Sequence, residues 1–142
     1  MEEILLILLS AAAVVTVLDQ ASKRMVRRRL LPGASVRLAA CLRIRHAANP
    51  RLALSSLRRW MLLAVWFFAA ATVVMAAVQG TWSQYPRVQL ALGSALAGTT
   101  SNFFDYMLRG SVTDMVDLRY WPVFNLADAA ILTGAVVVLL TL

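Results

Sequence analysis

The residues of this chain best suited to acid–base chemistry are carboxylates within or beside apolar segments. Asp105 is preceded three positions earlier by Asn102, and Asp128 is preceded in the same way by Asn125. Residues three positions apart share one face of a helix, and Asp114 lies in the connection between the two segments. We therefore expect all five side chains to gather at one end of a helix bundle.

Two of these carboxylates, Asp114 and Asp128, could act together on a peptide bond. Two carboxylates in a partly desolvated site do not both ionise easily, so one keeps a proton near neutral pH. The charged one can take a proton from water, while the protonated one polarises a carbonyl and later donates to the leaving amine. A simpler interpretation is that the aspartates cap helices or pair with Arg109 and Arg119. Asp114 alone fits both interpretations, but Asp128, expected about two turns inside an apolar helix, favours the chemistry.

The composition of the chain is typical of a protein that uses lipid as part of its solvent. Of its 142 residues, 61% are hydrophobic and the mean hydropathy is +0.72, whereas soluble domains contain about 45–50% apolar residues. The basic residues that produce the net charge of +7 lie between apolar segments, which favours a rim facing anionic lipid headgroups over a nucleic-acid site. The single Cys41 and the single His46, interpreted as a loop residue, offer no metal-ligand cluster. No metal and no cofactor are predicted.

The elements that would position the carboxylates are apolar segments near the about 20 residues that a spanning helix needs. They predict an all-α membrane protein, a four-transmembrane-helix bundle in a single membrane domain, 1–142, with spans at approximately 4–22, 60–78, 88–107 and 121–142. The third span has a small-residue face typical of close helix packing, at Gly93, Ser94, Ala97 and Gly98.

A surface loop of residues 23–59 separates the first two predicted spans. Pro32 and Gly33 mark a turn, and the imperfect alternation of apolar and polar residues from Ser35 to Arg45 predicts short strands on the membrane surface. We therefore expect a small β-rich surface cradle between helices 1 and 2, with a disordered basic loop as the alternative. A second loop, Leu108–Tyr120, lies on the same side and holds Asp114.

Several short motifs, in order along the chain, resemble those of one bacterial enzyme family. The segments Gly110–Asp117 and Pro122–Asp128 look like the C-terminal signature of bacterial lipoprotein signal peptidases (signal peptidase II). Asp19–Lys23 is similar to the family's Asp-Gln-x-x-Lys, and Ser101–Tyr106 resembles its Gly-Asn-x-x-Asp-Arg. Asn49 falls where the family's Asn-x-Gly-Ala-Ala-Phe motif begins. The resemblance covers almost the whole chain.

The resemblance implies a membrane-embedded aspartyl endopeptidase that cleaves the signal peptide of prolipoproteins just before a lipid-modified cysteine. Asp114 and Asp128 match the catalytic dyad. The residues that match substrate-binding or dyad-supporting positions are Asn49, Asn102, Asn125, Asp105, Asp19 and Lys23. The implied partners are a lipidated prolipoprotein or another membrane peptide, together with membrane lipids, and no nucleic acid. The implied location is the bacterial cytoplasmic (inner) membrane, crossed several times, with the active site on the exterior leaflet.

The match to the family motifs departs at several positions. Tyr106 replaces the arginine and Ser101 the glycine of Gly-Asn-x-x-Asp-Arg, and Pro50 follows Asn49 in the third motif. Tyrosine can donate one hydrogen bond but carries neither the charge nor the bidentate fork of arginine. Substrate engagement or dyad support at Tyr106 must therefore differ from the family pattern.

The charge distribution conflicts with the topology that the resemblance implies. All of the 14 lysines and arginines except Arg87 fall on the side of the bundle that holds the basic loop and the dyad. The positive-inside rule would place this side in the cytoplasm, whereas the family's chemistry requires it to face outward. We adopt the family topology, because an exported, lipidated substrate is available only on the exterior.

Two other functions are compatible with the same residues. The first is a catalytically degenerate family member that binds a lipid, a lipidated peptide or a membrane partner without cleaving it; the changes at Tyr106 and Ser101 favour this alternative, and both intact aspartates oppose it. The second is a proton or ion pathway through Asp105 and Asp128. A pathway is the weaker alternative, since acids for a transmembrane relay would be distributed with depth, not gathered at one edge.

Overall fold

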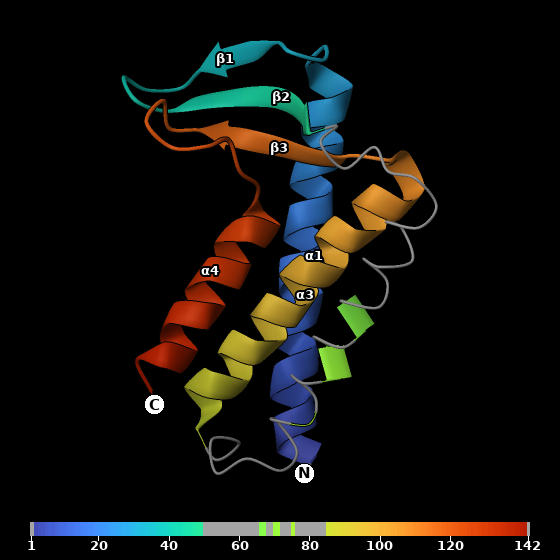
Figure 1. Cartoon of the computed structure of the whole chain (residues 1–142), viewed down its shortest axis with the longest axis vertical. Coiled ribbons are helices and arrows are strands. Elements are labelled where there is room, and N and C mark those ends of the chain that lie inside the picture. Colours follow the sequence, from blue (N-terminus) through green and yellow to red (C-terminus); the bar gives the residue numbers. More distant parts are fainter. Residues whose placement is uncertain (1, 50–65, 68–69, 72–74, 76–84, 142) are drawn as a thin grey trace.

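The computed structural model describes residues 2–49, 66–67, 70–71, 75 and 85–141. Over these residues the chain forms three helices and a three-stranded sheet (Figure 1). The helices are α1 (Glu2–Arg29), α3 (Pro86–Arg109) and α4 (Leu126–Leu139), and the strands are β1 (Ser35–Arg37), β2 (Arg43–Asn49) and β3 (Val112–Asp117). The sheet lies across one end of the helices, over the ends of α1 and α3 and the start of α4 (Figure 1).

The sheet is antiparallel with the strand order β1-β2-β3. The two strands that follow α1 confirm the predicted cradle, but the cradle is not confined to the loop between helices 1 and 2. Its third strand, β3, comes from the segment predicted as a loop before the last span. This segment forms a strand because its backbone pairs with β2 on one side and with Phe124 on the other, while Thr113, Asp114 and Met115 are buried. Asp114 therefore lies on a paired strand, opposite Ala47 of β2.

The helices pack closely around α3, which contacts both α1 and α4, whereas α1 and α4 touch each other little. Small residues allow this approach: a Cβ atom on Gly98 would lie 2.5 Å from the carbonyl oxygen of Ala127, and one on Gly134 would lie 2.5 Å from that of Ala91. Gly93 faces the backbone of Leu8 on α1 in the same way. The predicted small-residue face of the third span is thus confirmed, and it holds the start of α4 against α3.

Two predicted helix boundaries are wrong in ways that affect the site. The first helix runs on to Arg29 instead of ending near residue 22, so Lys23 belongs to a helix and not to the surface loop. The last helix begins at Leu126 instead of residue 121, because the Asn125 side chain caps it. Asp128 is consequently the third residue of α4, within its first turn, and not about two turns inside a span.

The number of membrane spans stays a prediction. One described helix, Leu6–Arg29, is long and apolar enough to cross a membrane, and Leu126–Leu139 is apolar but shorter. The third predicted span, 88–107, matches α3, Pro86–Arg109. Most of the second predicted span, 60–78, lies outside the described residues.

His46 is not the loop residue that the sequence suggested. It lies on β2 and is buried, and its ring Nδ1 is 2.8 Å from the carbonyl oxygen of Leu30, just after α1. A paired ring nitrogen satisfies the backbone at the end of the helix, so His46 ties the sheet to α1.

Candidate active site

Asp128 is held at the start of α4 by a reciprocal capping arrangement with Asn125. The Asn125 Oδ1 accepts a hydrogen bond from the backbone N–H of Asp128 at 2.9 Å, and the Asp128 Oδ2 accepts one from the backbone N–H of Asn125 at 3.2 Å. The helix-capping interpretation is therefore correct for one oxygen of Asp128. The other, Oδ1, accepts a hydrogen bond from Asn102 Nδ2 of α3 at 2.7 Å.

Asn125 also holds Asp114, and this brings both aspartates into one site. Its Nδ2 donates to the Asp114 Oδ1 at 2.8 Å. Asn125 is fully buried and Asp114 is nearly so, whereas Asp128 is partly exposed. Because the single amide of Asn125 has its oxygen on Asp128 and its nitrogen on Asp114, the spacing between strand β3 and helix α4 is set by that side chain.

Lys23 forms the centre of a buried ionic network behind the aspartates. Its Nζ lies 2.6 Å from the Asp19 Oδ2 and 3.0 Å from the Asp105 Oδ2, and all three side chains are fully buried. The same Nζ donates to the Asn102 Oδ1 at 2.8 Å. The Lys23 contact orients the Asn102 amide so that its NH₂ group points to Asp128. A buried charge of this kind is tolerated because it is paired and hydrogen-bonded.

Asp19 joins all three helices at this level. Its Oδ1 accepts from the backbone N–H of Ala127 at 2.9 Å, and its Oδ2 accepts from the Ser101 Oγ at 2.7 Å. Ser101 in turn accepts a hydrogen bond from Gln20 Nε2 at 2.7 Å. The first-turn N–H groups of a helix lack partners within the helix, so Asp19 satisfies one of them and fixes α4 to α1.

Asp105 lies behind the aspartates, with three cationic side chains around it. Besides Lys23, it pairs with Arg109 one turn later on α3 and lies 3.7 Å from the Arg27 Nη1. Arg27 also donates to the Thr113 Oγ1 on β3 at 3.1 Å. The guanidinium groups around Asp105 thus come from positions 27 and 109, while Tyr106 is buried.

Most of the sequence-predicted site residues lie in one hydrogen-bonded network. Asn102, Asp128, Asn125 and Asp114 form one chain of hydrogen bonds in that order. The remaining predicted residues, Lys23, Asp19 and Asp105, support Asn102 and α4. For Asn49, the described part is its backbone, which pairs with Val112 of β3. A role for the Asn49 side chain lies outside the described residues and stays a prediction.

Sequence reasoning missed Ser101, Gln20 and Arg27 as members of the network. Gln20 lies next to Asp19, and Ser101 next to Asn102. Both are polar residues within apolar segments and next to candidate residues, and this position in the sequence would have identified them. Arg27 gave no such signal, because the sequence placed it among the arginines of the basic surface loop, residues 23–59.

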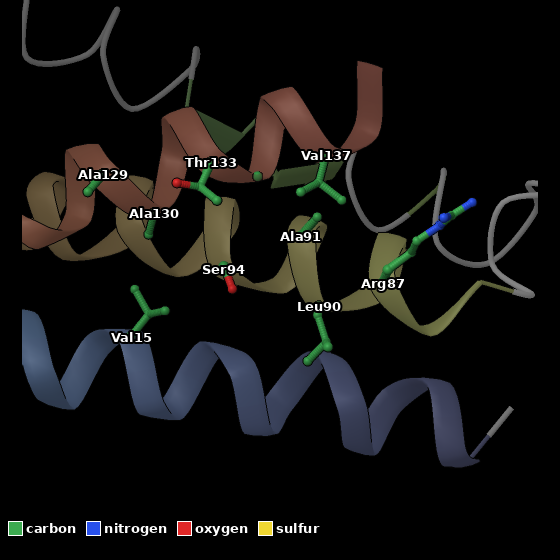
Figure 2. A pocket seen from close by; sticks show the side chains of 10 residues that line it. Val15, Arg87, Leu90, Ala91, Ser94, Ala129, Ala130, Thr133 and Val137 are labelled. Atoms are coloured by element: carbon green, nitrogen blue, oxygen red, sulfur yellow. The ribbon is translucent and has the colours of Figure 1, made fainter. Parts of the chain in front are cut away.

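One cavity opens beside Asp128, and a second, which Asp128 does not line, adjoins it. One, of about 300 Å³, is lined by Asp128 and by apolar groups that include Leu118, Trp121 and Phe124. The second, of about 500 Å³, lies between α1, α3 and α4, and Figure 2 shows Val15, Ser94 and Thr133 around it. Both cavities are lined by Ala129 and Thr133. The smaller cavity, with one carboxylate among apolar side chains, suits an apolar segment of a peptide or lipid.

No group of three or more His, Cys, Asp or Glu side chains that could hold a metal ion is found within the part of the chain that the structure describes. The expectation of a site without metal or cofactor stays a prediction.

Known proteins resemble this chain over almost its whole length. Residues 11–142 match the sequence model of the family described as "Signal peptidase (SPase) II". The lipoprotein signal peptidase of Moorella thermoacetica is 33% identical over 128 residues, which are 89% of this chain and 85% of that protein. That of Pelotomaculum thermopropionicum is 35% identical over 129 residues, 87% of this chain and 82% of that protein.

Solved structures share the same fold. One, described as a bacterial membrane enzyme studied by the in meso method, superposes with a TM-score of 0.86 over 94% of this chain and 90% of its own, at 22% sequence identity. A second with the same description has a TM-score of 0.85, over 94% of this chain and 85% of its own, also at 22% identity. At this identity the likeness is one of fold.

Proposed function

This chain belongs to the signal peptidase II family, and we propose that it is a membrane-embedded aspartic endopeptidase with Asp114 and Asp128 as its catalytic dyad. The proposed substrate is a lipidated prolipoprotein, cleaved just before the lipid-modified cysteine. One observation carries this proposal: the buried Asn125 side chain is hydrogen-bonded to both aspartates, at 2.9 Å to the Asp128 N–H and at 2.8 Å to the Asp114 carboxylate. A purely structural cap would need only the first of these contacts.

The proposed reaction gives the two aspartates different roles according to their surroundings. Asp128 is the base, since it lines the cavity and both of its oxygens already accept hydrogen bonds. Asp114 is the acid, since it is the more buried of the two. Asp128 takes a proton from a water molecule as the water oxygen adds to the scissile carbonyl carbon. Asp114 donates a hydrogen bond to the carbonyl oxygen and then gives its proton to the leaving amine as the C–N bond breaks. Transfer of one proton from Asp128 to Asp114 restores the starting state.

The remaining predicted residues act in this proposal through the dyad. Asn102 positions Asp128, and Lys23 orients Asn102. Asp19 and Asp105 balance the charge of Lys23 and fix the three helices at the level of the site. Asn49 is proposed to position substrate, on the family resemblance alone.

The proposed location is the bacterial cytoplasmic membrane, with four spans and the dyad on the exterior leaflet. Burial supports a lipid environment: large apolar side chains are exposed along α1 and α4, among them Leu6, Val17 and Leu132, while Asp19 and Asn125 are fully buried. Apolar outer surfaces of this kind indicate contact with lipid or partners, and a helix that crosses a bilayer keeps its polar side chains inward.

The test of the proposed function is cleavage of a lipidated prolipoprotein by the purified full-length chain in detergent and lipid. Asp114→Asn and Asp128→Asn should each lower kcat by at least about 10³-fold, because each removes a group that transfers a proton in the transition state. Asp117→Asn is the matched control, since it removes another carboxylate from strand β3. The Asp117 carboxylate accepts a hydrogen bond from the Arg119 N–H and contacts neither dyad residue. Retained cleavage by either dyad variant, with the fold intact by circular dichroism, would overturn the mechanism.

A second candidate function is binding of a lipidated peptide or membrane partner without cleavage. Tyr106, which replaces the arginine of the family motif, favours it. Tight binding of a lipidated peptide by the unmodified chain, with no turnover in any lipid mixture, would support this candidate against the endopeptidase. A proton pathway is less compatible with the site, because Asp105 and Asp128 lie at the same end of the bundle. Asp128 contacts Asn102 directly, and Asp105 is linked to Asn102 through Lys23.

A further inference from the structure

A basic cleft lies on the outer face of the bundle, where α1 and α3 end near the sheet. Its volume is about 560 Å³, and its walls are formed by side chains of both helices. The residues that line it are Gln20, Ala21, Arg24, Arg27, Arg28 and Arg109. None of these belongs to the dyad, and the proposed proteolytic reaction makes no use of the cleft.

The cleft carries more positive charge than its neighbours neutralise. Arg27, Arg109 and Lys23 all contact Asp105, and Lys23 also pairs with Asp19. In this group, two carboxylates pair with three cations, of which Arg27 and Arg109 line the cleft. Arg24 and Arg28 add two more charges, and among the described residues neither has an ion pair. The local excess is therefore three positive charges.

The helix dipole does not account for this excess. A helix C-terminus is equivalent to about half a negative charge and acts within its last turn, and the last turn of α1 already holds Arg27, Arg28 and Arg29. Arg24 lies one turn earlier. Guanidinium groups gathered from two helices around an open cavity are an arrangement that binds phosphate through several hydrogen bonds at once.

The helix face that carries the basic side chains continues as an exposed apolar stripe. Val14, Val17, Ala21, Arg24 and Arg28 follow one another at alternating spacings of three and four residues, so they share one face of α1. The Val14 and Val17 side chains are 58% and 65% exposed. At a rise of about 1.5 Å per residue, the stripe from Arg28 to Val14 is about 21 Å long, which is comparable to an extended acyl chain.

We propose that the cleft binds the phosphate headgroup of an anionic phospholipid, with an acyl chain of the lipid lying along Val14 and Val17. The charges of Arg24 and Arg28 supply the attraction to the headgroup, and Arg27 and Arg109 form the floor of the cleft. Free inorganic phosphate would satisfy the arginines but would leave the apolar stripe unused, so the lipid is the better occupant. This site rests on the proposed membrane location and is independent of the proposed proteolysis.

The test compares lipid binding by the purified full-length chain in a neutral detergent, using native mass spectrometry to count retained lipids. Phosphatidylglycerol should be retained in preference to phosphatidylcholine of the same chain length. Arg24→Gln/Arg28→Gln should weaken phosphatidylglycerol binding by about thirtyfold, the effect expected for two basic residues near an anionic lipid. Arg27 and Arg109 are left unchanged, because both contact the buried network.

The matched control is Arg37→Gln/Arg45→Gln, which removes the same charge from exposed positions on β1 and β2, outside the cleft. Retained phosphatidylglycerol preference in this control supports the cleft; equal loss in both double variants would overturn it in favour of diffuse surface charge. Thermal stabilisation by inorganic phosphate equal to that by phosphatidylglycerol at the same concentration would overturn the lipid assignment. A chain that binds the lipid in this way yet cleaves no prolipoprotein would contradict the proposed function and leave the lipid site intact.

Discussion

Asn125 has more influence on the site than its neutral amide suggests. One oxygen caps α4 through Asp128, and one NH₂ group holds Asp114 on β3. The second amide, that of Asn102, is oriented by Lys23, which binds its oxygen and so directs its NH₂ group toward Asp128. At the scale of single residues, therefore, the dyad is positioned by amides whose own orientation is determined by charged or backbone partners.

We predict that Asn125→Ser and Asn125→Ala separate the capping role of Asn125 from its contact with Asp114. Serine still caps a helix well, whereas alanine costs about 1 kcal/mol at such a position. Asn125→Ser should therefore retain most of the stability, and both variants should lose at least about tenfold in kcat, because neither holds Asp114. Thermal unfolding in detergent and prolipoprotein cleavage give the two readouts. Full activity in Asn125→Ser would show that the Asp114 contact is dispensable.

At the scale of elements, the site depends on three segments that meet at one level: the start of α4, strand β3 and the polar turn of α3. The small residues of α3 make this possible, because a larger side chain would separate the helices. Gly98 lies directly against Ala127, the residue before Asp128, and Gly134 makes an equivalent contact with Ala91 farther along α4.

We predict that Gly98→Ala lowers activity beyond its effect on stability, and that Gly134→Ala does not. Each new Cβ would lie 2.5 Å from a backbone oxygen, so each should destabilise the bundle by about 1–3 kcal/mol. Only Gly98→Ala displaces the first turn of α4, and a displacement of about 1 Å at a catalytic group can cost about 10²-fold in rate. The measurement is kcat of the folded fraction, with unfolding followed in parallel. Equal kcat in the two variants would contradict this assignment.

At the scale of the whole molecule, charge and hydrophobicity are distributed unevenly. Among the described residues, the lysines and arginines lie at the sheet end except Arg87, which is in the first turn of α3. Fully buried side chains include Asp19, Lys23 and Asp105, whereas many leucines and valines face outward. This arrangement fits a bundle surrounded by lipid and leaves a strongly basic sheet at one membrane surface.

We predict that Cys41, the single cysteine, reacts with a membrane-impermeant maleimide added to intact spheroplasts. Cys41 is exposed and lies between β1 and β2 at the sheet end, so its labelling reports which side of the membrane holds the dyad. The matched control is Cys41→Ser combined with Arg87→Cys, which moves the thiol to the opposite end and should react only after lysis. The reverse pattern would place the dyad in the cytoplasm, as the positive-inside rule requires.

Much of the site was predictable because its residues have local signatures. The i, i+3 pairs Asn102–Asp105 and Asn125–Asp128, and the motif at Asp19–Lys23, are visible in the sequence. The strand around Asp114 was not predicted, because a strand of six residues is stabilised by pairing with β2, which is distant in the sequence. The start of α4 was predicted at residue 121 because the apolar residues from Trp121 onward fit a span. A local interaction decided otherwise: the Asn125 side chain caps the helix, which therefore begins at Leu126.

By itself, the sequence determined the chemical inventory of this protein: two aspartates with amide partners, an Asp-Gln-x-x-Lys motif at Asp19–Lys23 and apolar segments consistent with lipid. These features depend on residue type and on spacing along a helix, which are local properties. Only the tertiary structure decided that one Asn125 amide joins Asp114 to Asp128, that Lys23 acts through Asn102, and that four arginines from α1 and α3 line one cleft. Those relations hold between residues up to about a hundred positions apart, and the packing of α1 and α4 against α3 brings them together.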